Sequence, residues 1–236
     1  MAGPLTCMVD RHGRSGRPEL EVSLKQDPAP RLAASLAPEH DWNAASKVVR
    51  PSLRPVGTVG TDGRALRLPS GTAGPGKPIV AVGPAGLPLV YVLPGAGFEV
   101  VVGVEHLLAW GVGPDQVHAA AISNLEAWSD GAAWMDESNG HRILTWSDTG
   151  EGQDAARILL PQVRDRLVSI LGSGDRRILV GLPERDVLIA TGLAVDDVEF
   201  VAMFSEYVAD RALAADEPID GRVFELIGGE LVELQA

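Results

Sequence analysis

Short apolar runs separated by glycine and proline dominate the first half of the chain. The runs Pro88–Leu93 and Phe98–Gly103 are rich in valine and leucine, and the tight turn Pro94–Gly97 lies between them. This arrangement is typical of antiparallel neighbours in a sheet. We therefore predict strands here, together with extended segments over Lys47–Val59 and Ile79–Val82.

The period of the apolar positions changes to a helical one after this region. A helix is predicted from Pro114 to Trp128, because apolar residues recur there on one face and proline is favoured in a first turn. A second helix is predicted from Asp154 to about Leu171, and Pro161 should kink it or divide it. A third is predicted from Val195 to about Ala214. The apolar stripe of the first helix consists of Val117, Ala121, Leu125 and Trp128.

Strands in the second half come as hairpins. Asn139-Gly140 is a strong turn signal between two strand-like runs, "RILVGLPERDVLIATG" reads as strand, turn and strand, and the chain closes with a hairpin at Gly228-Gly229. Strands that alternate singly with helices would indicate a parallel sheet instead. We therefore predict an α+β fold: a mainly antiparallel sheet built from hairpins, with about three main helices packed on it.

The beginning of the chain is weakly patterned. Residues 1–46 contain several prolines, with an alternating run at Leu20–Leu24 and a short helix-like run at Pro30–Ala37. We therefore divide the chain into an N-terminal segment, 1–46, and an α+β domain, 47–236.

Acidic side chains outnumber basic ones. The 236 residues include 32 acidic and 20 basic side chains, for a formal charge of −12. This charge repels a phosphate backbone and an anionic membrane surface, so we expect neither nucleic acid nor membrane as a partner.

Cysteine use and the first residues suggest a compartment. Cys7 is the single cysteine, so no internal disulfide and no cysteine-based zinc site can form. The first residues lack the apolar core of a secretory signal, and no run approaches the length of a membrane span. We expect a soluble, cytoplasmic protein, and the preference for arginine over lysine suits a G+C-rich bacterial genome.

One glycine-rich stretch is similar to a phosphate-binding loop. Gly71, Gly76 and Lys77 have the spacing of the G-x-x-x-x-G-K-[ST] motif. However, Pro78 occupies the position of the magnesium-binding hydroxyl, and a strand rather than a helix follows. We predict a surface loop there and expect no cofactor.

The remaining common catalytic patterns are missing from the sequence. The five histidines include no pair three or four residues apart and no H-E-x-x-H, and there is no G-x-S-x-G elbow. We therefore predict no metal site and no hydrolase nucleophile.

Polar residues at apolar positions are the better candidates for a site. Asn124 lies on the apolar stripe of the first helix, where it either ties the helix to a neighbouring backbone or belongs to a site. Asp154 is placed to cap the second helix, with Arg157 on a neighbouring face. This pair is either a cap with a solvated or ion-paired arginine, or a carboxylate and a guanidinium that hold a charged ligand.

A third candidate lies between two apolar strands. Glu184, Arg185 and Asp186 form either a solvated turn or part of a sheet rim, where sites are often built.

The order of these features resembles the YtpQ-like family of uncharacterised bacterial proteins. The resemblance covers residues 47–236 and is carried by "VVRPSLR", "PLVYVLPGAGFEVVVGVEHLLAWGV", "AAISNLEAW", "GQDAARILLP", "ILVGLPERDVLIATG" and "GRVFELIGGELVEL". It implies an α+β fold and a set of polar positions, and it implies no known activity. Carried over to this chain, those positions are Asn124, Asp154, Arg157 and Asp186.

Two functions follow as expectations. The first is a binding or accessory protein that recognises a protein or a small anionic ligand through a buried cluster of Asn124, Asp154, Arg157 and Asp186. The second is a metal-independent enzyme with Asp154 or Asp186 as general acid/base and Arg157 stabilising negative charge. An exposed apolar patch would favour the first. The partner's identity and the oligomeric state, including a homo-oligomer, are left open.

Overall fold

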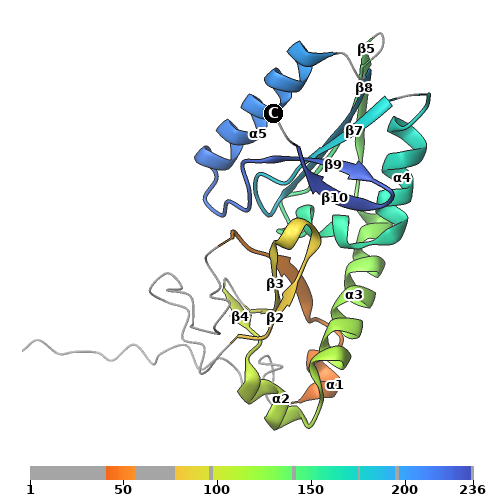
Figure 1. Cartoon of the computed structure of the whole chain (residues 1–236). Helices are drawn as coiled ribbons and strands as arrows, with labels where there is room; N and C mark the ends of the chain where they lie inside the picture. The colour runs from red at the N-terminus through yellow and green to blue at the C-terminus, as the bar shows by residue number, and fades with distance from the viewer. Residues whose placement is uncertain are drawn as a thin grey trace, which may run out of the picture.

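The computed structural model describes residues 41–56, 78–95, 98–139, 142–174, 176–194 and 197–234. Over these residues the chain forms two antiparallel sheets and five α-helices (Figure 1). The predicted α+β fold with antiparallel strands is confirmed, although the strands divide between two sheets. The predicted elements before residue 41 and the glycine-rich stretch up to Lys77 lie outside the described residues.

The first sheet is built around one central strand. β3 pairs with β1 along one edge, while β2 and β4 share the other edge, each against a different half of β3. All side chains from Leu89 to Leu93 are buried, so both faces of β3 are covered. The strands are β1 (Arg50–Leu53), β2 (Val80–Val82), β3 (Pro88–Pro94) and β4 (Glu99–Val101).

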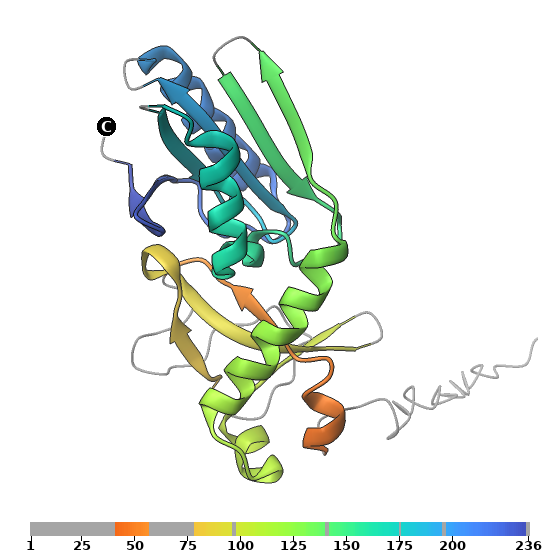
Figure 2. The ribbon, with the colours of Figure 1, turned by 90° about the vertical axis from the view of Figure 1, so that its right-hand side faces the viewer.

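A long helix, α3 (Pro114–Gly131), runs beside this sheet and reaches the second one (Figure 2). Its predicted stripe is confirmed, because Val117, Ala121 and Leu125 are buried. The sequence did not predict the short helix α2 (Val104–Trp110), whose seven residues stand between Gly103 and Gly111.

Part of the segment before residue 47 packs into the fold. The short helix α1 (Trp42–Ala45) buries Ala45 completely, and Trp42 packs on Trp110 of α2 with ring centroids 5.4 Å apart.

The second sheet has the order β10-β9-β7-β8-β6-β5, and every neighbouring pair is antiparallel. The predicted hairpins are confirmed. Asn139 pairs with Arg142, and Gly228 and Gly229 have φ values of 59° and 86° in the last turn. The strands are β5 (Met135–Asn139), β6 (Arg142–Asp148), β7 (Arg176–Gly181), β8 (Val187–Ala194), β9 (Val223–Ile227) and β10 (Glu230–Glu233).

Helices cover both faces of the second sheet. Leu179 and Ile189 pack towards α5 (Val198–Ala214), whereas Val180 and Ala190 belong to the core shared with α4 (Pro161–Leu171). The predicted second helix is divided at Pro161, as expected, into the 3-10 helix η3 (Ala155–Leu159) and α4. One of the three apolar clusters among the described residues runs from the first sheet through α3 and η3 to α4.

Candidate functional site

Arg157 is buried where α3, β6 and η3 meet, with 1% of its surface exposed. A guanidinium has five N–H groups, and here each has an acceptor. Nε donates to Ser129 Oγ at 3.0 Å, and Nη2 donates to the carbonyls of Ser129 and Ala132 at 3.1 and 3.4 Å. Nη1 donates to the Ala133 carbonyl at 3.2 Å and to Ser147 Oγ at 2.6 Å. No N–H of Arg157 is left for a ligand.

The surroundings of Arg157 explain why a cation is held there. Its Cζ lies 4.1 Å from the ring centroid of Trp134 and 5.8 Å from that of Trp128. Three of its acceptors are carbonyls at the C-terminal end of α3, where the helix dipole is negative. Burial lowers the pKa of Arg157 to about 10, so the group is still charged at neutral pH. Arg157 therefore caps α3 and joins it to β6.

Asp154 is fully buried beside this arginine, and Ser147 bridges the two residues. The Ser147 hydroxyl accepts from Arg157 and donates to the Asp154 carboxylate. The carboxylate also accepts from Thr149, through its backbone N–H at 3.2 Å and its hydroxyl at 2.7 Å.

The prediction that Asp154 caps the following helix was wrong. Its side chain makes no capping hydrogen bond to η3. A capping residue normally has an extended backbone, but Asp154 already has helical angles of φ −61° and ψ −45°. The carboxylate therefore turns back to the end of β6.

Asn124 has a different set of partners. Its Nδ2 donates to the carbonyls of Ser46 at 3.0 Å and Val49 at 2.8 Å. These bonds fasten α3 to the connection between α1 and β1, which is the structural alternative stated for this residue.

Asp186 lies in the turn immediately before β8 and is half-buried. Its carboxylate accepts from the backbone N–H of Gly152, in the loop after β6. Within the described ranges, no hydrogen bond joins Asp186 or Asn124 to the Asp154–Arg157 pair. Of the four predicted positions, the hydrogen bonds thus connect only two, through Ser147.

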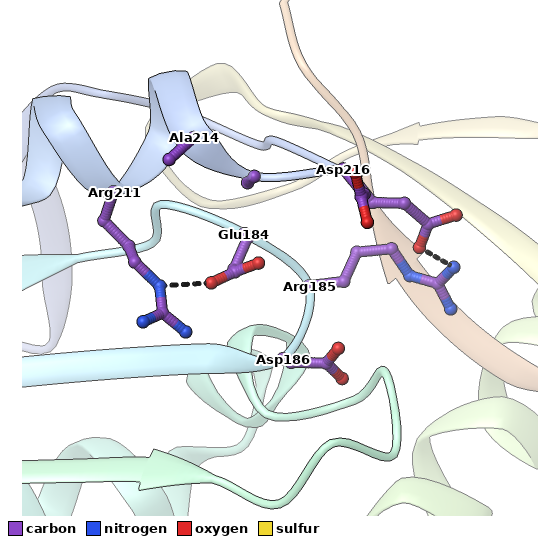
Figure 3. Close-up of a pocket in the computed structure, with 8 residues that line it drawn as sticks. Glu184, Arg185, Asp186, Arg211, Ala214 and Asp216 are labelled. Carbon is purple, nitrogen blue, oxygen red and sulfur yellow. Dashed lines mark hydrogen bonds and ion pairs between the residues drawn. The ribbon is translucent and has the colours of Figure 1, made fainter.

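Asp186 also lines a pocket of about 340 Å³ between the β7–β8 turn and the segment that follows α5 (Figure 3). Six of its eight lining residues are charged, four of them acidic and two basic. The lining consists of Glu184, Arg185, Asp186, Arg211, Ala214, Ala215, Asp216 and Glu217. The sequence pointed to the first three, but Arg211, Asp216 and Glu217 were missed because only the fold brings them there.

Arg185 connects this pocket to the first sheet. Its Nη2 lies 2.6 Å from Glu99 of β4, and its Nη1 lies 2.5 Å from Glu217. Burial opposes its charge, but the two carboxylates outweigh burial and raise the pKa of Arg185. Glu99 in turn lies 3.6 Å from Arg54, which follows β1.

The second arginine of the pocket is also paired. Arg211 and Glu184 point towards one another and form an ion pair, and Arg211 lies 3.4 Å from Asp148 (Figure 3). In the part of the chain that the structure describes, no hydrogen bond or ion pair reaches the Asp216 carboxylate. The pocket therefore has an excess of negative charge.

Several large apolar side chains are exposed on α5, next to this pocket. The helix buries Phe204 and Val208 against the sheet. On its outer side, Met203, Tyr207 and Leu213 are 52%, 47% and 85% exposed. We call this side, from Val198 to Ala214, the outer face of α5.

Neither a metal site nor a membrane span was found among the described residues. No three histidine, cysteine or carboxylate side chains gather there in a way that could hold a cation. None of the helices there combines the length and the apolar character needed to cross a bilayer.

Comparison of the chain with protein-family models, curated proteins and solved structures gave no match. The resemblance to the YtpQ-like family therefore stays a prediction.

Proposed function

We propose that this chain is a non-catalytic accessory protein that binds another protein through the outer face of α5. The observation that supports this most is the exposure of Met203, Tyr207 and Leu213 on one helix. Single exposed apolar residues are ordinary, but several large ones on one face are typical of interaction sites. Covering them with a partner would stabilise a complex by about 25 cal/mol for each Å² of apolar surface removed from water.

The buried polar cluster gives less support to recognition of a small anion. An anion would need free donors, and all five N–H groups of Arg157 already have acceptors. We therefore place recognition on α5 and assign Asp154 and Arg157 to the stability of the fold.

The enzyme alternative now depends on Asp186. Asp154 has no exposed surface, so a substrate could not reach it without local opening. Asp186 lines the open pocket and has Arg185 beside it, which keeps a general acid/base role available there.

Site-specific photo-crosslinking tests the accessory function. A benzophenone side chain is introduced at Tyr207 in the full-length protein, and the matched control is Val168 on α4, which is also 47% exposed. Irradiation in the host cell should give one discrete adduct with a different protein from position 207 and none from position 168. The adduct should disappear when Met203→Gln and Leu213→Gln are added.

Three outcomes would contradict this function. They are no adduct from position 207, equal adducts from both positions, or an adduct between two copies of this chain.

A further inference from the structure

The charges around the outer face of α5 indicate what kind of partner it fits. On the premise of the proposed function, we infer that the partner contributes a basic amphipathic segment. Its apolar side chains cover Met203, Tyr207 and Leu213, and its lysine or arginine side chains meet the carboxylates of α5 and of the adjoining pocket.

Charge is distributed unevenly along α5. Glu199, Glu206 and Asp210 are exposed on the same side as the apolar residues. The single basic residue of the helix, Arg211, is paired with Glu184 and Asp148. Among the residues that the structure describes, Arg142 lies near Glu199, whereas Glu206 and Asp210 make no ion pair. The outer face therefore keeps an excess of carboxylates, and an acidic or phosphorylated segment would be repelled over about 8 Å at physiological salt.

Apolar and acidic positions share a helical spacing on the outer face of α5. Met203, Glu206, Asp210 and Leu213 follow one another at intervals of three or four residues, and Tyr207 lies four residues after Met203. Such positions are neighbours on a helix surface. A partner segment that places basic side chains between its apolar ones would match this order, which describes a basic amphipathic helix.

The charged pocket adjoins the outer face of α5. It opens where α5 ends, and Ala214 belongs to both surfaces. Asp216 there has no ion pair or hydrogen bond among the described residues, and the C-terminal end of a helix attracts cations. A lysine or arginine at the end of the partner segment would therefore meet Asp216.

The test uses a synthetic helical peptide of leucine and lysine as the probe, with a peptide that has glutamate in place of lysine as its counterpart. Binding to the full-length protein is measured by fluorescence anisotropy at physiological salt. We expect the lysine peptide to bind and the glutamate peptide not to bind. The triple variant Glu199→Lys, Glu206→Lys and Asp210→Lys should weaken binding at least about tenfold.

A matched variant controls for net charge. Asp130→Lys, Glu137→Lys and Asp165→Lys change the charge equally at exposed positions on α3, β5 and α4. This variant should change the affinity by less than about threefold. Equal weakening by both triple variants would overturn the inference, and so would equal binding of the two peptides.

Two further variants separate the parts of the argument. If Met203→Gln with Leu213→Gln abolishes binding while the α5 charge variant does not, the inference fails and the accessory function stands. If position 207 gives no protein adduct in cells, the accessory function itself fails. Asp216→Asn should weaken binding of the lysine peptide about threefold, and an unchanged affinity would remove the pocket from the inference.

Discussion

Arg157 and Arg185 are two guanidinium groups that the fold shields from water by different means. The acceptors around Arg157 are uncharged, namely three backbone carbonyls and two hydroxyls. Arg185 has the carboxylates of Glu99 and Glu217 and stays 11% exposed beside a pocket. Neutral, saturated acceptors fix one geometry, whereas ionic partners at a pocket can be exchanged for a ligand. Arg157 is therefore a structural arginine, whereas Arg185 lies beside a candidate site.

The largest expected effect is that of Arg157→Lys. Lysine has three donors in a different geometry, so at least two acceptors would be left unpaired in the core. We expect the free energy of unfolding, measured with urea, to fall by about 3–5 kcal/mol. Arg176→Lys should change the free energy of unfolding very little, because the one side-chain hydrogen bond of Arg176 among the described residues is a 3.4 Å contact with Ser173. A loss of unfolding free energy below about 1 kcal/mol for Arg157→Lys would contradict the structural role of this residue.

A smaller effect is expected for Asp154→Asn. The amide would replace a carboxylate that has three donors around it, at a cost of about 1–3 kcal/mol. Because Ser147 connects the two side chains, Asp154→Asn and Arg157→Lys should be non-additive by at least about 0.5 kcal/mol. The effects of Asp186→Asn and Arg157→Lys on the free energy of unfolding should be additive. Strong coupling in that second cycle would mean that the two regions form one network.

Salt should distinguish the two arginines. Arg185→Ala is expected to cost about 1 kcal/mol, because water can reach Glu217 and Arg54 remains near Glu99. Since 1 M salt shortens the screening length to about 3 Å, this cost should shrink there. The cost of Arg157→Lys should not change with salt. Urea unfolding at low and high NaCl measures both, and an unchanged cost at Arg185 would count against its ionic role.

The smallest effect is expected at the surface pair of Glu225 and Arg177. Arg177 donates to this carboxylate at 2.9 and 2.7 Å, and these hydrogen bonds lower the pKa of Glu225. The pair therefore stabilises the fold above the ordinary pKa of about 4.3. That stabilisation disappears as the pH falls through the lowered pKa.

We expect Glu225→Gln to cost about 0.5 kcal/mol at pH 7. At acid pH, the free energy of unfolding of the Glu225→Gln variant should equal that of the wild type. Urea titrations from pH 7 to pH 2 test this, and a difference that grows in acid would contradict the sign.

Sequence reasoning succeeded where the determinants were local. The stripe Val117–Leu125 required a helix, Pro161 lacks the N–H that a continuous helix needs, and Asn139-Gly140 is suited to a tight turn. It missed α2 because seven residues between two glycines are too short to establish a period.

The candidate site was harder to predict because its contacts are tertiary. Asn124 finds its acceptors 78 and 75 residues earlier in the chain, and Arg211 meets Glu184 across 27 residues. The Asp154 carboxylate accepts from Ser147 and Thr149 at the end of β6, and it does not cap η3 as the local sequence predicts. An inward-facing polar residue could be identified from the pattern, but its partner could not.

The apolar cluster shared by the two sheets has a consequence for how the molecule unfolds. Leu53 and Tyr91 from the first sheet belong to the same buried cluster as Leu125, Leu171 and Phe224. Separating the two sheets would expose the apolar side chains that both contribute to this cluster, while α5 would still cover the other face of the second sheet. We therefore expect neither sheet region to be stable alone. The two sheets should therefore melt in one cooperative transition, with equal calorimetric and van't Hoff enthalpies. A cut after α3 should yield two fragments that fold only when mixed.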